Sequence, residues 1–167
     1  GEAAQRIAED KLRILRFFRF QARFGRGAPD AQALAACAAA APGIDGLSGE
    51  RVRAETFKIL ALPAPGAILA RMAGAGVLQR ILPNGFDLAG LEKCDGDPLR
   101  RLSAMAVGGG GGAETADVIA ERLRLSNQQA RRLAFMMSPP KAFASDMSGP
   151  ALRQLLYDHG PDAITDL

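Results

Sequence analysis

Apolar residues recur at helical spacing over the first two dozen positions of the chain. Five of them share one side when successive residues are placed about 100° apart: Ile7, Ile14, Phe17, Phe18 and Ala22. Residues 3–24 contain neither proline nor glycine, and Gly25 follows directly. This pattern predicts one long amphipathic helix over residues 3–24.

Shorter segments bounded by helix-start and helix-stop residues follow. Ser48 and Ser126 stand where N-caps are expected, and Pro98 stands at a first helical position, where its missing N–H does no harm. The predicted helices cover residues 29–41, 48–62, 66–73, 77–82, 87–93, 98–107, 113–123, 126–137 and 149–158. Valine, isoleucine and threonine number only 15 in 167 residues, too few for a substantial sheet. We therefore expect an all-α protein, a multi-helix array with no sheet.

Five consecutive glycines occupy positions 108–112. A phosphate-binding loop would need a Gly-Lys-Ser or Gly-Lys-Thr ending, which this run lacks. Because glycine does not hold a helix, the run predicts a flexible linker.

Positive charge is concentrated at the start of the chain. Residues 1–27 carry seven basic and three acidic side chains, while the whole chain has a net charge of +3. This imbalance favours a polyanionic or nucleotide partner, although a solvated basic face explains it equally well. The longest apolar run, residues 33–41, is too short to cross a bilayer, so no membrane segment is expected. The two cysteines lack C-x-x-C spacing, which favours a reduced, cytoplasmic setting without a disulfide or zinc site.

Asp10 is the most unusual residue of the first predicted helix. It falls at the edge of the apolar side, where an ionised carboxylate is unfavourable unless it is compensated. Arg13 and Arg6 are close enough along a helix to compensate it. One interpretation is an intrahelical ion pair. The other is a hydrogen-bond template for a base, in which the carboxylate accepts from an exocyclic amine and Arg13 donates to the neighbouring ring nitrogen or carbonyl.

The stretch 6–20, which reads RIAEDKLRILRFFRF, resembles the glutamate-aspartate-x-x-arginine motif of the class II tRNA nucleotidyltransferase and bacterial poly(A) polymerase family. Residues 47–55 look like the next helix motif of that family, and residues 97–102 and 122–127 resemble parts of its body region. The resemblance implies a neck-like, nucleotide-reading region over 1–62 and a body-like region over 63–167.

The resemblance also implies roles for particular residues. Asp10 and Arg13 would contact the base of CTP or ATP, and Arg16 and Arg19 would lie along the nucleotide and its phosphates. Four further residues would support the base-reading helix. Glu9 would hold an arginine in place, and the helix would be braced by Glu50, Arg53 and Glu55. Further arginines could follow an RNA backbone or simply be solvated: Arg100, Arg101, Arg122, Arg124, Arg131 and Arg132.

Nothing in the chain matches the family's catalytic head, a small sheet whose carboxylates bind Mg²⁺. We therefore expect no catalytic or metal-binding residue here and no nucleotide transfer by this chain alone. The implied whole protein adds CCA to tRNA 3′ ends with CTP, ATP and Mg²⁺. The alternatives are a poly(A)-adding activity in the same family, or a noncatalytic helical module that binds RNA or another protein.

Overall fold

The computed structural model describes residues 3–25, 27–94 and 96–139. In this part of the chain the regular structure consists of eight α-helices and three short 3₁₀ helices, with no strand. The all-α prediction is confirmed. The α-helices are α1 (Ala3–Glu9), α2 (Leu12–Phe24), α3 (Ala31–Ala40), α4 (Gly49–Leu60), α5 (Gly66–Gly74), α6 (Pro98–Gly108), α7 (Ala113–Arg122) and α8 (Asn127–Met137). The 3₁₀ helices are η1 (Ala41–Gly46), η2 (Leu78–Arg80) and η3 (Leu91–Lys93).

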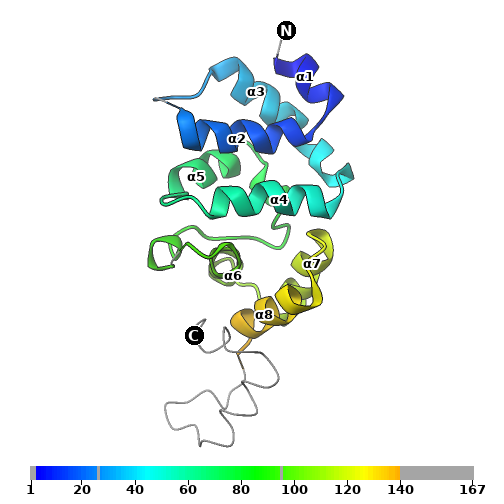
Figure 1. The fold of residues 1–167 in the computed structure, drawn as a ribbon, viewed down its shortest axis with the longest axis vertical. Coiled ribbons are helices and arrows are strands. Elements are labelled where there is room, and N and C mark those ends of the chain that lie inside the picture. Colours follow the sequence, from blue (N-terminus) through cyan, green and yellow to red (C-terminus); the bar gives the residue numbers. More distant parts are fainter. Residues whose placement is uncertain (1–2, 26, 95, 140–167) are drawn as a thin grey trace, which may run out of the picture.

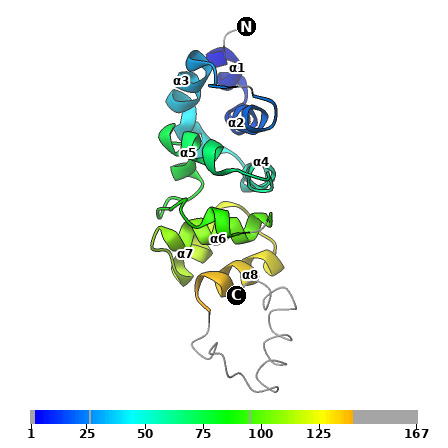
Figure 2. The same cartoon turned by 90° about the vertical axis from the view of Figure 1, so that its left-hand side faces the viewer.

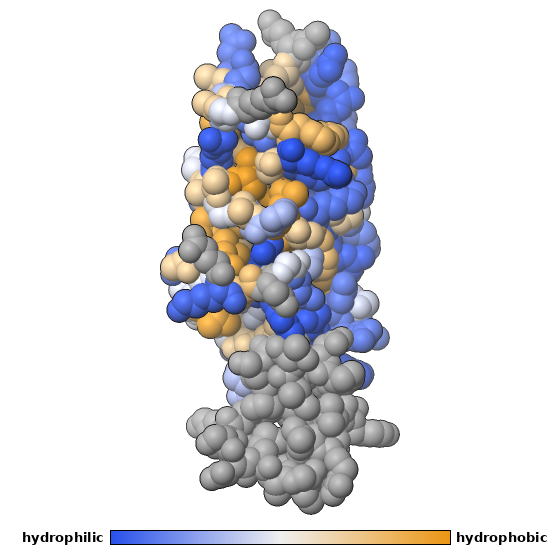
Figure 3. Space-filling model, turned by 60° about the vertical axis from the view of Figure 1, so that its left-hand side comes forward, coloured by the Kyte–Doolittle hydropathy of each residue, from blue (hydrophilic) through white to orange (hydrophobic). Residues whose placement is uncertain are grey.

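The helices form an elongated stack (Figure 1). α1, α2 and α3 lie at one end, α4 and α5 follow, and α6, α7 and α8 lie at the other end; the perpendicular view shows the same order (Figure 2). α2 packs on α4, α4 packs on α6, and α8 packs on both α6 and α7. One cluster of buried apolar side chains runs through the stack, from Ile7 to Met137. On the surface, apolar side chains gather in the middle of one face and hydrophilic ones follow its edge (Figure 3).

The single long helix predicted over residues 3–24 is wrong: the structure divides it into α1 and α2 at Asp10 and Lys11. The backbone N–H of Leu12 donates to Asp10 Oδ1 at 3.0 Å. An aspartate side chain that bonds to a nearby backbone N–H offers the chain an alternative to helical hydrogen bonds. The bond from Arg13 N–H to the Asp10 carbonyl (3.0 Å) then starts the new helix.

Local start signals are confirmed. The Ser48 hydroxyl accepts from the Arg51 N–H, and Ser126 forms a reciprocal capping box with Gln129. Asp97 caps the helix that begins at Pro98. Residues 77–82 and 87–93 hold only the short η2 and η3 rather than α-helices. The predicted helix over 149–158 lies outside the described residues.

The glycine run 108–112, predicted as a flexible linker, forms a hydrogen-bonded turn. The N–H of Gly109 donates to the Met105 carbonyl at 3.1 Å, and the N–H of Gly111 donates to the Ala106 carbonyl at 2.9 Å. Gly110 adopts a φ of +88°, a conformation that side chains disfavour. The run therefore ends α6 and turns the chain directly into α7.

The predicted boundary between residues 62 and 63 stays a prediction, but contacts across it are close. The guanidinium of Arg101 in α6 donates to the carbonyl oxygens of Leu60 and Leu62, the latter at 2.6 Å. The two regions therefore pack against each other directly.

Candidate nucleotide-binding site

The carboxylate of Asp10 lies at the break between α1 and α2 and faces α4. Its two oxygens accept from the same nitrogen, Arg51 Nη2, at distances of 3.2 Å for Oδ1 and 3.0 Å for Oδ2. The proposed intrahelical partners, Arg13 and Arg6, do not fill this role. Asp10 lies between α1 and α2 rather than within one helix, and a residue 41 positions later supplies the compensating charge.

Asp10 is ionised in this setting. The Leu12 N–H, followed by the charge and hydrogen bonds of Arg51, lowers the pKa of the Asp10 carboxyl below its ordinary value, although partial burial works in the opposite direction. The group is therefore a hydrogen-bond acceptor at neutral pH.

An ionised carboxylate offers about four lone-pair sites. In Asp10, Oδ1 accepts from both Leu12 and Arg51, while Oδ2 accepts from Arg51 alone. One acceptor site on Oδ2 is left. An exocyclic amine of a base needs one such site.

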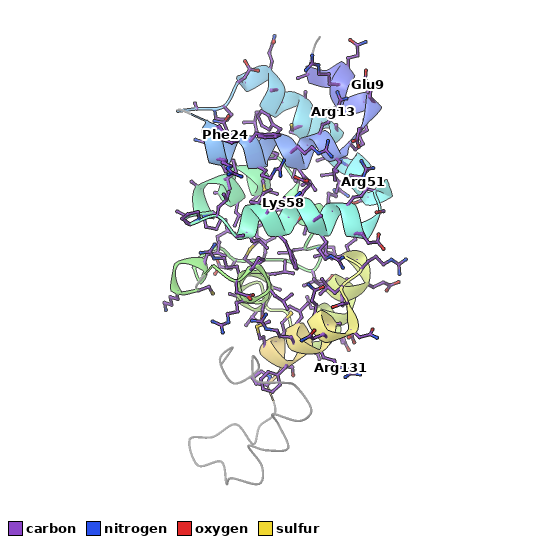
Figure 4. All side chains as sticks on the ribbon, viewed as in Figure 1. Glu9, Arg13, Phe24, Arg51, Lys58 and Arg131 are labelled. Atoms are coloured by element: carbon purple, nitrogen blue, oxygen red, sulfur yellow. The ribbon has the colours of Figure 1, made fainter. Side chains whose placement is uncertain are left out.

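Arg13 lies in the first turn of α2 and pairs with Glu9 at the end of α1. Arg13 Nη1 and Glu9 Oε2 are 3.2 Å apart; the support role that the resemblance implies for Glu9 stays a prediction. Glu9, Arg13 and Arg51 lie along the same edge of the molecule, on α1, α2 and α4 (Figure 4). An open hollow of about 650 Å³ adjoins this edge; its lining residues are Gln5, Arg6, Glu9, Arg13, Arg16 and Phe20.

Arg19 does not line this hollow. Its Nε lies 3.1 Å from Oε2 of Glu55 on α4, an ion pair without hydrogen-bond alignment. Glu55 is buried and also binds Lys58 Nζ at 3.2 Å. Glu55 thus ties α2 to α4 and is the ion-pair partner of Arg19. The predicted roles of the two residues, bracing for Glu55 and a nucleotide contact for Arg19, stay predictions.

Glu50 and Arg53 occupy a different side of α4. Arg53 donates to the carbonyl oxygen of Arg124, after α7. The Glu50 carboxyl has a lowered pKa because its own N–H and the Ser48 hydroxyl bond to it, with smaller effects from Arg124 and Arg53. Arg53 thus connects α4 with the α7–α8 turn, the bonds of Glu50 lie at the start of α4, and none of these bonds reaches α2.

Three of the six body arginines make contacts that hold helices together. Arg101 is buried, as described above, and Arg122 donates to the Arg80 carbonyl at 3.3 Å and to the Ile44 carbonyl at 2.8 Å. Arg132 pairs with Asp97 at 3.0 Å. Arg100 is partly buried, and only Arg124 and Arg131 among the six are exposed. Of the six arginines predicted to follow an RNA backbone, these two are therefore the most accessible to solvent, and the RNA contact itself stays a prediction.

Sequence reasoning missed Arg51. Its partner lies on another helix, and no spacing rule connects positions 10 and 51. The only available signal was its place inside the second family-like segment, between Glu50 and Val52.

The described residues contain no group of three His, Cys, Asp or Glu side chains that could hold a metal ion. Within the same residues, every helix is too short or too polar to span a bilayer.

Residues 28–87 match the family model described as the probable RNA and SrmB-binding site of polymerase A. Three curated relatives match longer stretches of the chain than this family model does. The mitochondrial CCA tRNA nucleotidyltransferase 1 of Mus musculus is 52% identical over 96 residues, which are 56% of this chain and 22% of that protein. The Bordetella bronchiseptica CCA-adding enzyme is 41% identical over 94 residues, 55% of this chain and 25% of that protein. The Multifunctional CCA protein of Methylococcus capsulatus is 32% identical over 150 residues, 83% of this chain and 33% of that protein.

The chain belongs to the class II tRNA nucleotidyltransferase and poly(A) polymerase family. It spans between a fifth and a third of the length of these three relatives. A solved complex of a CCA-adding enzyme with CTP has the same fold over 92% of this chain and 38% of that one, with a TM-score of 0.61. At 20% identity, that likeness concerns the fold alone.

Proposed function

We propose that this member of the family reads the base of CTP and ATP and binds RNA, as part of an enzyme that adds CCA to tRNA 3′ ends. The observation that supports base reading is the acceptor site left on the ionised Asp10 carboxylate, three positions before Arg13, which lines an open hollow. Cytosine and adenine both carry an exocyclic amine, which donates to such an acceptor, whereas uracil lacks it. Relatives named as CCA-adding enzymes support the same substrate class.

Arg13 supplies the complementary donor. A guanidinium has five N–H groups, and Glu9 engages one nitrogen of Arg13. The remaining donors of Arg13 can bond to a ring nitrogen or a carbonyl of the base. Arg16, which lines the same hollow, is the candidate for a phosphate contact.

Transfer itself needs more than these residues. The family resemblance implies Mg²⁺, but the described residues offer no cluster of ligands that would hold it. We therefore derive no metal-dependent step from this chain. Magnesium, and a cytoplasmic location like that expected for bacterial relatives, are proposed for the whole enzyme.

The test is Asp10→Asn in the whole enzyme that carries this chain. The amide keeps the shape of the carboxylate. Because the Leu12 N–H needs an oxygen at the Oδ1 position, the amide nitrogen, a donor, takes the Oδ2 position, and the base amine loses its acceptor. We expect the preference for CTP and ATP over UTP to fall about tenfold to a hundredfold, which corresponds to about 1–3 kcal/mol for an unsatisfied polar group. Incorporation of each labelled nucleotide into tRNA measures this preference.

Asp45→Asn is the matched control, since Asp45 forms a comparable exposed ion pair with Arg80 at 3.1 Å. It should leave the preference unchanged. Unchanged preference in Asp10→Asn, together with a lower melting temperature, would mean that Asp10 only stabilises the fold.

A poly(A)-adding activity is the second candidate, because the matching family model is described for polymerase A. The same assay separates the two, since incorporation of ATP without CTP is the result expected for poly(A) addition. Incorporation of neither nucleotide would favour a noncatalytic RNA-binding module.

A further inference from the structure

An exposed stripe of arginine and phenylalanine follows the outer face of α2. Arg16, Phe20, Arg23 and Phe24 are spaced by four, three and one positions, which places them on one side of a helix. Phe20 is 51% exposed and Phe24 is 66% exposed. Because the two rings adjoin, they form an exposed apolar patch, and such patches mark interaction sites more often than single exposed side chains do.

The two rings are ordered against each other and against cations. Their centroids are 6.0 Å apart and their planes differ by 26°, a stacked arrangement. The Arg19 guanidinium lies 4.7 Å from the Phe20 centroid, and that of Arg23 lies 5.4 Å from the Phe24 centroid. Such contacts hold the rings in place on the surface.

The stripe carries positive charge without compensation. α2 contains four arginines and no acidic residue. Two of them are paired, Arg13 with Glu9 and Arg19 with Glu55. Arg16 and Arg23 form no ion pair within the described part of the chain.

We propose that Phe20 and Phe24 form a stacking surface for bases of single-stranded RNA, with Arg16 and Arg23 binding its phosphates. The charge pattern favours this occupant. A protein partner that covered the rings would also bury two unpaired guanidinium groups, whereas a polynucleotide brings both aromatic faces and negative charge. From Arg16 to Phe24 the stripe is about 12 Å long, enough for a few nucleotides.

This inference rests on the proposed RNA-binding function and specifies the form of the RNA. Bases in a duplex stack on one another and cannot lie against a protein ring, while those of an unpaired 3′ end can. The stripe begins beside the hollow that Phe20 shares with Arg13 and Arg16. Phe24 lies at the other end of α2 (Figure 4), so it extends the RNA path beyond the nucleotide site.

The experiment measures fluorescence anisotropy of a labelled single-stranded RNA of about eight nucleotides, titrated with the 167-residue chain at low salt. Phe24→Ala should raise Kd about fivefold to a hundredfold, the range expected for the loss of one stacked base. Phe24→Trp should retain the affinity of the parent chain. Arg23→Gln should weaken binding and reduce its dependence on salt.

Val118→Ala is the control, because Val118 is an exposed apolar residue on α7. It should leave Kd unchanged. A duplex RNA of the same length should bind Phe24→Ala and the parent chain equally. Because Phe24 is exposed, all variants should show the circular dichroism spectrum of the parent.

Three results would overturn the inference: no binding of single-stranded RNA by the parent chain, equal affinity of Phe24→Ala and the parent, or equal weakness of Phe24→Trp and Phe24→Ala. The second result is also the one expected if a protein segment covers the stripe. Failure of base reading is recognised separately, because it appears as unchanged nucleotide preference in Asp10→Asn, whatever Phe24→Ala does.

Discussion

Replacing Glu55 with glutamine should destabilise the fold more than any exposed charge change. The Glu55 side chain is only 6% exposed and lies between Arg19 Nε at 3.1 Å and Lys58 Nζ at 3.2 Å. Removing one charge of a buried pair is destabilising by about 3–5 kcal/mol, because the remaining charge stays desolvated. Arg19 is 23% exposed and Lys58 is 53% exposed, so solvent screens part of this loss. We expect the free energy of unfolding to fall by about 2–3 kcal/mol.

Thermal unfolding followed by circular dichroism measures this effect. For a chain of this size, the loss corresponds to a melting temperature about 5–10 °C lower. The double variant Arg19→Met, Glu55→Leu removes both charges and should recover much of the loss, since an apolar pair of similar size has no desolvation penalty. Asp45→Asn, which breaks an exposed pair, should change stability by less than about 1 kcal/mol. A stable Glu55→Gln, or a double variant as unstable as the sum of its single variants, would refute this account.

Two further predictions concern packing and burial. A Cβ on Gly109 would collide with the backbone nitrogen of Phe86, so Gly109→Ala should lower the free energy of unfolding in urea by about 1–3 kcal/mol. Gly74→Ala, with open space around it, should not. Burial raises the pKa of the Cys37 thiol to about 11, so a thiol reagent at pH 8 should modify the partly exposed Cys94 first and reach Cys37 only after unfolding; equal rates in the folded chain would contradict this.

Helix starts and stops were predictable because their causes are local. Ser48 and Ser126 act within three residues of their own positions, and the shortage of β-branched residues is a property of composition. The break at Asp10 was not predictable from propensity. No proline or glycine marks it, and the bonds that favour it come from the Asp10 side chain itself and from Arg51 on another helix.

The burial of individual arginines was likewise not predictable from the sequence. Sequence reasoning treated Arg101 and Arg124 alike, as positive charges available to RNA. In the structure the first is buried against backbone carbonyls and the second is exposed. Arg101 reaches the carbonyls of Leu60 and Leu62 because α6 packs at the end of α4. The spacing of charges along the sequence does not predict that packing.

The arrangement of charges around α2 explains how one helix can both stabilise the fold and recognise a ligand. Arg51 and Glu55 are four positions apart on α4, so they project from one face of that helix. They bind Asp10 and Arg19 respectively, one before α2 and one within it. Two such ties, together with the buried core side of α2, fix its rotation about its own axis. The remaining face of α2, with its uncompensated arginines and exposed rings, is therefore held toward solvent, where a nucleotide or an RNA strand can reach it.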